Sequence, residues 1–304
     1  MATSQRDVKN RITSIQNIRK ITRAMEMVAA ARLRRAEQRI ERLRPYAGAI
    51  RRMTRQAAEA AGGEMGSLPI LQQHESENTI GLLLVTADRG LAGAFNSQIL
   101  RGGLRAASDY ESDGKTVSFY ATGRRGTSSL TFRGREPAGS WVGFTERPSY
   151  ADAREVAEAL MAAYVDNQID RVDILYNGYV SPLVQEVRRE TLLPMQEATI
   201  LEGTERDREG TEDEETGHNA LVEYEPDPAI ILERLIPDYV EISIYRALLE
   251  SSASELGARM TAMRNASENA GELIEQYTLE MNRARQAEIT QEIMEVVGGA
   301  EALT

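Results

Sequence analysis

The strongest constraint on the fold is a regular apolar pattern near the C-terminus, between about Pro237 and Ala300. Apolar or small residues recur there in alternating steps of four and three over five heptads, which is typical of a helix packed in a coiled coil. At a rise of about 1.5 Å per residue, this helix would be roughly 95 Å long and would extend beyond an ordinary domain. The predicted seam positions are Leu249, Ala253, Leu256, Met260, Met263, Ser267, Ala270, Ile274, Tyr277, Met281 and Ala284.

This pattern shifts by one residue after Ala284. The four-three spacing leads to Glu288 and Gln291, whereas the apolar residues resume at Ile289, Ile293, Val296 and Ala300. A shift of one residue rotates the apolar stripe by about 100° around the helix axis. We interpret the shift as the point where the helix stops facing its coiled-coil partner. A stutter within one continuous coiled coil is the alternative.

The N-terminal segment from Ser4 to Ala60 has the pattern of a second long helix. Pro45 removes one internal hydrogen bond and is expected to kink or interrupt this helix. Because both apolar stripes must be buried, the two terminal helices are expected to pair antiparallel. The stripe predicted for the N-terminal helix contains Val8, Ile12, Ile15, Ile18, Ile21, Met25, Val28, Leu33, Ile40 and Leu43.

The residues between these helices have the pattern of a Rossmann-like α/β domain. An apolar run at 80–85 predicts a strand, the glycine-containing turn 86–93 follows it, and 95–107 is predicted to be helical. Further strands are predicted at 117–121, 172–176 and 184–193, the last at a sheet edge or hairpin, and a helix at 150–165. The predicted organisation is therefore a helix at 1–60, a central domain at 75–225 and a helix at 229–304. Residues 202–227 are predicted to form an acidic, solvated linker.

The charge of the chain is unevenly distributed. The net charge is −11, yet residues 1–60 hold fifteen Arg or Lys and only five Asp or Glu. A basic helix could bind nucleic acid, dock on an acidic protein surface, or only face solvent. No aromatic residue interleaves with the arginines between Arg19 and Arg44, and the pI is about 5.0, which disfavours nucleic acid. We expect these arginines, among them Arg32, Arg34 and Arg35, to face outward and to make many weak contacts.

The residue types used in most catalytic and metal sites are scarce in this sequence. The chain has no cysteine, and its two histidines, His74 and His218, are predicted to be surface residues in loops. The turn Asp88–Gly93 matches neither GxGxxG nor GxxxxGK[ST], and we expect Asp88 and Arg89 to form an ion pair within it. We therefore expect no cofactor, no metal and no catalytic site. No apolar run approaches membrane-spanning length and no apolar signal core is present, so we expect a soluble, intracellular protein that reaches a membrane only through partners.

Five segments of the sequence resemble the signatures of one family, the gamma subunit of F-type ATP synthases. In the first helix the match is at 20–31, and in the central domain it is at 87–93 with Asn96, where the family usually has Ser at Ala87 and often Cys at Ala92. The other matches are at 224–228 and, in the last helix, at 258–263 and 282–293. The acidic segment around 205–215 and the arginine-rich first helix depart from the family pattern.

The resemblance implies a function as the central rotor shaft of the ATP synthase. The antiparallel helix pair would lie inside a hexamer of alpha and beta subunits, and the central domain would rest on the epsilon subunit and the membrane ring of c subunits. Proton flow through the membrane sector would turn the shaft and so drive ATP synthesis in the alpha/beta head. The subunit would make and break no covalent bonds, and it would lie peripherally at the cytoplasmic face of the cell membrane.

The resemblance also implies which residues couple the shaft to its partners. It suggests that Tyr224 lies at the end of the central domain nearest the membrane ring. Met25 is expected near the beta subunits, where it would meet Met260 or Met263 across the seam. The residues assigned to this coupling region are Met25, Arg259, Arg285, Gln286 and Thr290, with ordinary coiled-coil packing or surface exposure as the alternative.

Two other classes of protein remain compatible with the residues alone. One is a nucleic-acid-binding protein that uses its basic N-terminal helix. The other is an α/β enzyme with a helical hairpin for dimerisation. The first would retain RNA or DNA in a salt-sensitive manner, and the second would bind a nucleotide without partners.

Overall fold

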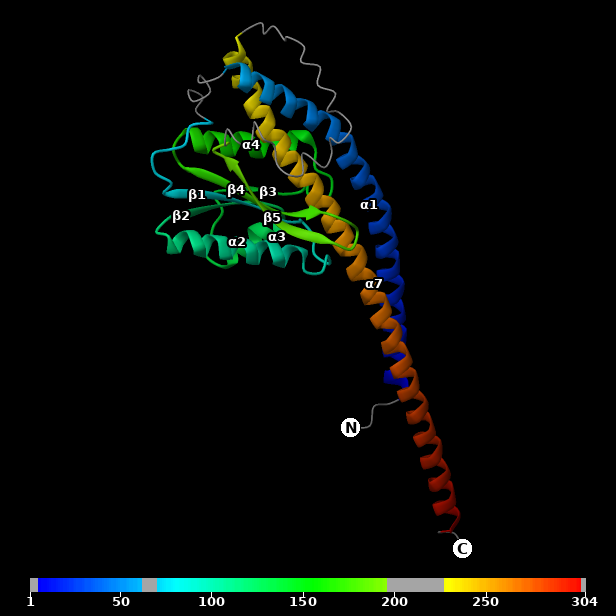
Figure 1. The fold of residues 1–304 in the computed structure, drawn as a ribbon. Helices are drawn as coiled ribbons and strands as arrows, with labels where there is room; N and C mark the ends of the chain where they lie inside the picture. The colour runs from blue at the N-terminus through cyan, green and yellow to red at the C-terminus, as the bar shows by residue number, and fades with distance from the viewer. Residues whose placement is uncertain (1–4, 62–69, 196–226, 302–304) are drawn as a thin grey trace. The chain divides into compact units, whose positions relative to one another are not determined.

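A computed structural model describes residues 5–61, 70–195 and 227–301 of the chain (Figure 1). The chain divides into two compact units, one of Met1–Ala31 with Arg259–Thr304 and the other of Arg32–Ala258. Both divisions fall within the two long helices, α1 (Gln5–Ala61) and α7 (Pro228–Glu301). Within the described residues, none of the helices combines the length and hydropathy needed to cross a lipid bilayer.

Both long helices continue through a proline. Helix α1 is not interrupted at Pro45, although an interruption was one of the two outcomes expected there. Helix α7 begins at Pro228, next to the predicted start at 229, and Pro237 lies inside it. A proline suits the first turn of a helix because the N–H group it lacks would have no intrahelical partner there. The acidic segment at 202–226, predicted to be a linker, lies outside the described residues.

In the first unit, α1 and α7 pair as antiparallel helices. The Nε atom of Arg264 lies 2.9 Å from a carboxylate oxygen of Glu26, and the guanidinium group of Arg19 lies beside Gly271. In both pairs the residue numbers add to 290, as they must when two helices run in opposite directions. The predicted antiparallel pairing is therefore confirmed.

The predicted seam of α7 is also confirmed in this unit. Every seam position from Met260 to Ala284 is buried or half-buried. After the one-residue shift, Ile289, Ile293 and Val296 are 48%, 57% and 73% exposed. By the antiparallel register, Arg285 lies level with Gln5, the first described residue of α1. The shift thus falls where the described part of α1 begins, and the red end of α7 continues past it in Figure 1.

The stripe predicted for α1 is wrong at three positions in this unit. Ile18, Ile21 and Val28 are 52%, 59% and 52% exposed. Val8 and Ile12 are buried as predicted, and Thr22 and Ala29 are the other buried residues of this part of α1. Small side chains at a seam let two helix backbones approach closely, so the largest apolar residues do not mark the contact. At about 100° per residue, the three misassigned residues lie on one face of α1. Met27 is also exposed, at 61%, but it lies on another side of the helix.

The second unit is built on a five-stranded sheet in the order β3-β2-β1-β4-β5. Four strands are parallel, and β5 runs antiparallel to β4 at one edge, as predicted for 184–193. Helices α2 and α3 cover one face and α4 covers the other (Figure 1). This arrangement confirms the predicted α/β class. The strands are β1 (Thr79–Val85), β2 (Thr116–Thr122), β3 (Gly139–Trp141), β4 (Arg171–Tyr179) and β5 (Gln185–Leu193), and the helices are α2 (Phe95–Ser112), α3 (Arg124–Phe132) and α4 (Tyr150–Val165).

Each face of the sheet has its own hydrophobic core. On the side of α2 and α3, Leu82 and Leu84 of β1 pack with Ile99 and Leu130. On the other side, alternate residues of the same strand pack with α4 and with parts of both long helices. This second cluster includes Leu83, Val85, Leu160 and Tyr176, Ile50 and Ala57 of α1, and Leu232 and Leu248 of α7. Residues 32–61 and 228–258 are therefore part of the core of this unit.

Candidate functional site

The turn after β1 is fixed by one carboxylate. Asp88 accepts hydrogen bonds from the backbone nitrogens of Gly143, Thr145 and Arg124 at 2.9, 3.2 and 3.1 Å, and from the Thr145 hydroxyl at 2.8 Å. Burial alone would raise the pKa of Asp88, but these hydrogen bonds to the charged form hold it below its usual value. The predicted ion pair between Asp88 and Arg89 is wrong, because Arg89 pairs with Glu146 at 3.0 Å.

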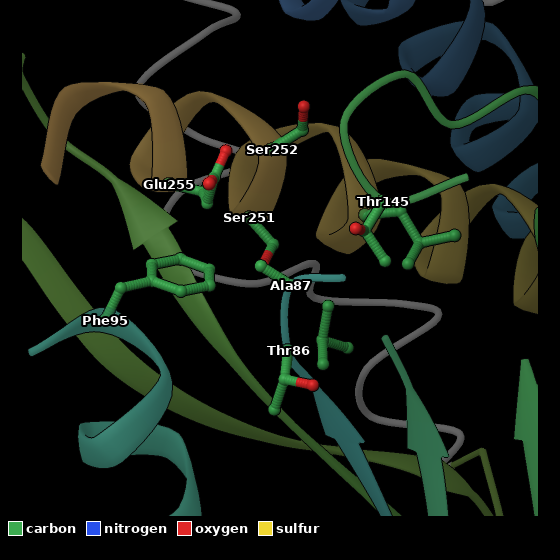
Figure 2. Close-up of a pocket in the computed structure, with 9 residues that line it drawn as sticks. Thr86, Ala87, Phe95, Thr145, Ser251, Ser252 and Glu255 are labelled. Carbon is green, nitrogen blue, oxygen red and sulfur yellow. The ribbon is translucent and has the colours of Figure 1, made fainter. Parts of the chain in front are cut away.

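A small pocket lies at the carboxyl end of β1, where doubly wound sheets commonly bind ligands. Helix α7 forms one wall of it (Figure 2). Only about 10 Å³ of the pocket can hold the centre of a water-sized sphere, which is room for about one water molecule. A nucleotide would not fit in this pocket. Its lining residues are Val85, Thr86, Ala87, Phe95, Thr145, Leu248, Ser251, Ser252 and Glu255.

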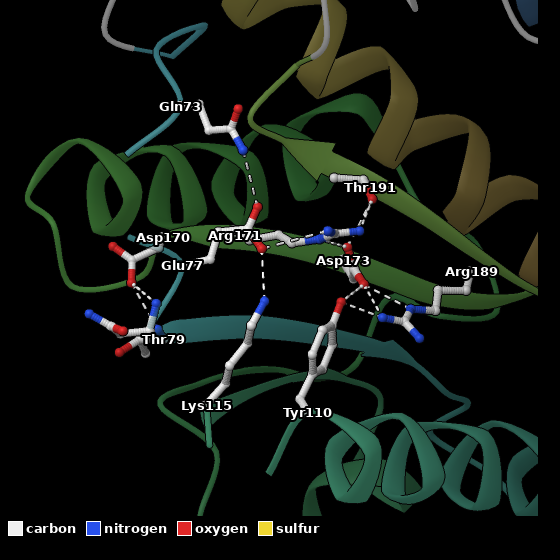
Figure 3. Close-up of polar contacts among 11 residues, drawn as sticks. Gln73, Glu77, Thr79, Tyr110, Lys115, Asp170, Arg171, Asp173, Arg189 and Thr191 are labelled. Carbon is white, nitrogen blue, oxygen red and sulfur yellow. Dashed lines mark hydrogen bonds and ion pairs between the residues drawn. The ribbon is translucent and has the colours of Figure 1, made fainter. Parts of the chain in front are cut away.

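A buried carboxylate in the sheet has a structural role. Asp173 of β4 is fully buried and accepts hydrogen bonds from the Tyr110 hydroxyl at 2.7 Å and from Arg189 at 2.8 Å (Figure 3). Its other oxygen accepts from Arg171 at 2.9 Å and from the Thr191 hydroxyl at 3.0 Å. Four donors occupy this carboxylate, so it joins α2 to the two strands at the sheet edge and is not available as a general base.

His74 is not the loop surface residue that the sequence predicts. Its Nδ1 atom lies 2.8 Å from Asp170, its ring stacks on Tyr164 at 4.5 Å between centroids, and its side chain is 17% exposed. His218 lies outside the described residues. Among the described residues, no cluster of three or more His, Cys, Asp and Glu side chains is placed to hold a metal ion.

The predicted coupling residues do not converge on one site. Met25 is half-buried and level with Asn265, two residues from Met263 in α7. Arg285 lies twenty residues further along α7, which corresponds to about 30 Å of helix. Arg259 is buried, whereas Arg285, Gln286 and Thr290 are exposed, with the Thr290 hydroxyl donating to the Gln286 carbonyl at 2.8 Å. Tyr224 lies outside the described residues.

Two exposed apolar surfaces of the first unit are the candidate contact surfaces. Contiguous exposed apolar residues commonly mark protein interaction sites. The surface on α1 was not identified from the sequence, because these residues were predicted to lie in the seam. The one available signal was that they do not keep the four-three spacing of the residues that are buried against α7. The surface on α1 consists of Ile18, Ile21 and Val28, and the surface on α7 consists of Ile289, Ile293, Met294, Val296 and Val297.

Comparisons with known proteins cover nearly the whole chain. A family model described as ATP synthase matches residues 4–303. The ATP synthase gamma chain of a Nocardioides species is 41% identical over 307 aligned positions, which span 100% of this chain and 97% of that protein. The ATP synthase gamma chain of Frankia casuarinae is 40% identical, with 100% and 99% covered.

Solved structures have the same fold. One is from the central stalk and c-ring of the Tetrahymena thermophila mitochondrial ATP synthase, 27% identical, with a TM-score of 0.58 over 81% of this chain and 99% of that one. Another is from the rotor of the Euglena gracilis mitochondrial ATP synthase, 18% identical, with a TM-score of 0.64 over 94% and 98%. The second likeness concerns the fold alone.

Proposed function

This chain belongs to the ATP synthase gamma family, and from that premise we propose that it is the central rotor shaft of an F-type ATP synthase. It couples proton flow through the membrane sector to ATP synthesis in the alpha/beta head. The observation that carries this proposal is the 41% identity over the full chain to an ATP synthase gamma chain. The antiparallel pair of α1 and α7 is the physical counterpart of that function, because two packed helices resist bending and twisting better than one.

The two ends of the helix pair have different tasks in this proposal. The C-terminal end of α7, beyond Arg285, presents exposed apolar side chains such as Ile293 and Val296. A single helix with this surface enters the bore formed by the alpha and beta subunits. Its surface differs from side to side, so each rotational position presents different groups to each beta subunit. The sheet unit rests on the epsilon subunit and the c-ring, and through them the chain belongs to a membrane-associated complex at its cytoplasmic face.

Co-purification is the direct test of this proposal. A tagged chain should be isolated from its own cells together with alpha and beta subunits. Salt-sensitive retention of RNA or DNA without these subunits would instead support a nucleic-acid-binding protein. Nucleotide binding by the isolated chain would support an α/β enzyme.

Replacing Met25 by lysine tests the coupling region. Met25 is half-buried on the first helix next to the Glu26–Arg264 ion pair, so a lysine there adds a charge that disturbs both the seam and this pair. We expect Met25→Lys to reduce ATP-driven proton pumping more than ATP hydrolysis, both measured in membrane vesicles. Met53→Lys, at a 50% exposed position of the same helix, is the control for the added charge. An equal loss of pumping and hydrolysis would remove any special coupling role from Met25.

A cysteine at Tyr224 tests the assignment of the foot. The chain has no native cysteine, so Tyr224→Cys would carry a cross-linker at a single position. We expect cross-links to epsilon or c subunits in the assembled complex, detected by mass and subunit-specific antibodies. Cross-links to alpha or beta subunits alone would contradict the assignment.

A further inference from the structure

We propose that Glu146 is a positioning residue that fastens the sheet to both shaft helices, so that the sheet unit and the shaft turn together. This inference rests on the proposed function as a rotor. One residue of the segment between β3 and α4 contacts three separate elements, and every contact lies within residues 32–258. We call Glu146 and its partners Arg32, Arg89 and Ser252 the Glu146 clasp.

The clasp uses both the side chain and the main chain of Glu146. One carboxylate oxygen accepts a hydrogen bond from Arg32 of α1 at 2.8 Å, and the other lies 3.0 Å from Arg89 in the turn after β1. The main-chain oxygen of Glu146 accepts a hydrogen bond from the Ser252 hydroxyl of α7 at 3.0 Å. The residue therefore joins α1, α7 and the end of a central strand.

The segment that carries Glu146 is held firmly by the sheet unit. On one side, Asp88 binds the backbone nitrogens of Gly143 and Thr145. On the other side, Ser149 caps α4 in a capping box with Asp152. With the segment anchored at both ends, a force on the sheet reaches Glu146 through hydrogen bonds of defined direction.

Directional contacts matter for a rotor because apolar packing alone is not directional. Apolar contacts resist separation of the helices from the sheet, but they resist sliding and turning less well. Other polar contacts join a single helix to the sheet. Examples are Arg246 of α7 with Glu190 of β5 at 2.8 Å, and Tyr179 of β4 with Glu37 of α1. The Glu146 clasp differs from these contacts because it holds both helices at once.

The clasp separates Arg32 from its neighbours on α1. Arg32, Arg34 and Arg35 are all exposed, and we expected them to be equivalent outward-facing charges. Arg32 instead pairs with Glu146, whereas Arg34 and Arg35 make no ion pair within the described part of the chain. Arg34 is therefore a matched control that removes the same charge from the same helix without opening the clasp.

The test uses the assembled enzyme in inverted membrane vesicles. The variants are Glu146→Gln, Arg32→Ala, Arg34→Ala and Glu146→Asp, and the measurement is the ratio of ATP-driven proton pumping to ATP hydrolysis. Because exposed ion pairs contribute little to stability, we expect assembly and hydrolysis to stay near the wild-type level. Losing one such pair shifts the ratio of closed to open clasp by up to about five-fold. We expect Glu146→Gln and Arg32→Ala to lower the pumping ratio by similar factors within that limit, with Arg34→Ala unchanged and Glu146→Asp partly restoring it.

A double variant shows whether the two residues act as one contact. Glu146→Gln combined with Arg32→Ala should lower the ratio no further than the stronger single variant, whereas its combination with Arg34→Ala should equal Glu146→Gln alone. Additive losses for Glu146 and Arg32, or an Arg32→Ala ratio equal to that of Arg34→Ala, would overturn the clasp. A wild-type chain that never assembles with alpha and beta subunits would instead disprove the proposed function. If Glu146→Gln fails to assemble, the comparison of Arg32→Ala with Arg34→Ala still decides the matter.

Discussion

Replacing Gly123 by alanine is expected to lower the free energy of unfolding of the sheet unit by about 3–5 kcal/mol. Gly123 precedes α3 with a φ of +86° and a ψ of +136°, a backbone conformation that is essentially confined to glycine. A Cβ atom there would lie 2.2 Å from the carbonyl oxygen of Thr86 and 2.8 Å from the carbonyl carbon of Ala87. Both obstacles are backbone atoms of the segment after β1, so no side-chain rotation relieves the clash.

The measurement is urea unfolding followed by tryptophan fluorescence. Trp141 is the only tryptophan in the sequence, and its carbonyl accepts a hydrogen bond from the Gly123 nitrogen at 2.7 Å. Gly114→Ala is the control, because Gly114 also has a positive φ of +79° but has open space where a Cβ would lie. That variant should lose only about 1–2 kcal/mol of backbone strain. If both variants lost the same free energy of unfolding, the close approach of the backbone to Gly123 would contribute nothing to the effect.

The elements that the sequence predicted well carry their own local signals. Helix α4 was predicted with the observed bounds from its apolar stripe, and the structure shows that a capping box of Ser149 and Asp152 begins it. Strand β1 was identified from its uninterrupted apolar run. Such a run is expected because helices cover both faces of the sheet, so side chains on both sides of the strand are buried. Helix α3 and strand β3 were missed. The first has nine residues with Gly126 inside it and the second has three residues, so neither is long enough to develop a period.

Three positions in the seam of α1 were mispredicted for a different reason. A helix with large apolar residues at Ile18 and Ile21 and small ones at Thr22 and Ala29 carries two competing stripes. The sequence of α1 alone favours the larger residues. The choice depends on packing against α7, and the ion pair of Glu26 with Arg264 lies at this contact. Such a register cannot be deduced from one helix.

The polar contacts around the turn after β1 could also not be predicted from neighbouring residues in the sequence. Asp88 was assigned to its neighbour Arg89, but its partners at Gly143 and Thr145 lie 55 and 57 residues away. Glu146 has no sequence signal at all, since its role arises from where α1 and α7 pass. The family was identified from the sequence, because its motifs are long and occur in the expected order. The predicted coupling residues remain predictions, since their partners are other chains.

Replacing Asp173 by alanine is expected to cost about 3–5 kcal/mol of unfolding free energy, the range for breaking a buried ion pair from one side. Asp173 is fully buried, and its loss leaves Tyr110, Arg171 and Arg189 without their shared acceptor. Asp109→Ala, at an exposed position of α2, should change stability by no more than about 0.5 kcal/mol. Urea unfolding of both variants measures the difference. A small loss for Asp173→Ala would show that the two arginines find water or other acceptors at no cost.

The pKa of the Asp173 carboxylate determines how the free energy of unfolding is expected to depend on pH. Burial would raise the pKa of Asp173, but hydrogen bonds from Tyr110, Arg171 and Arg189 outweigh it and hold the pKa below its usual value. A pKa that is lower in the folded than in the unfolded chain stabilises the fold above the unfolded value of about 3.9. This stabilisation is lost as the pH falls from there through the folded value. We therefore expect the stability gap between the wild type and Asp173→Asn, measured by urea unfolding, to be constant near neutral pH and to narrow below about pH 4. A gap that stays constant down to pH 3 would mean that the pKa of Asp173 is the same in the folded and the unfolded chain, and it would contradict the prediction.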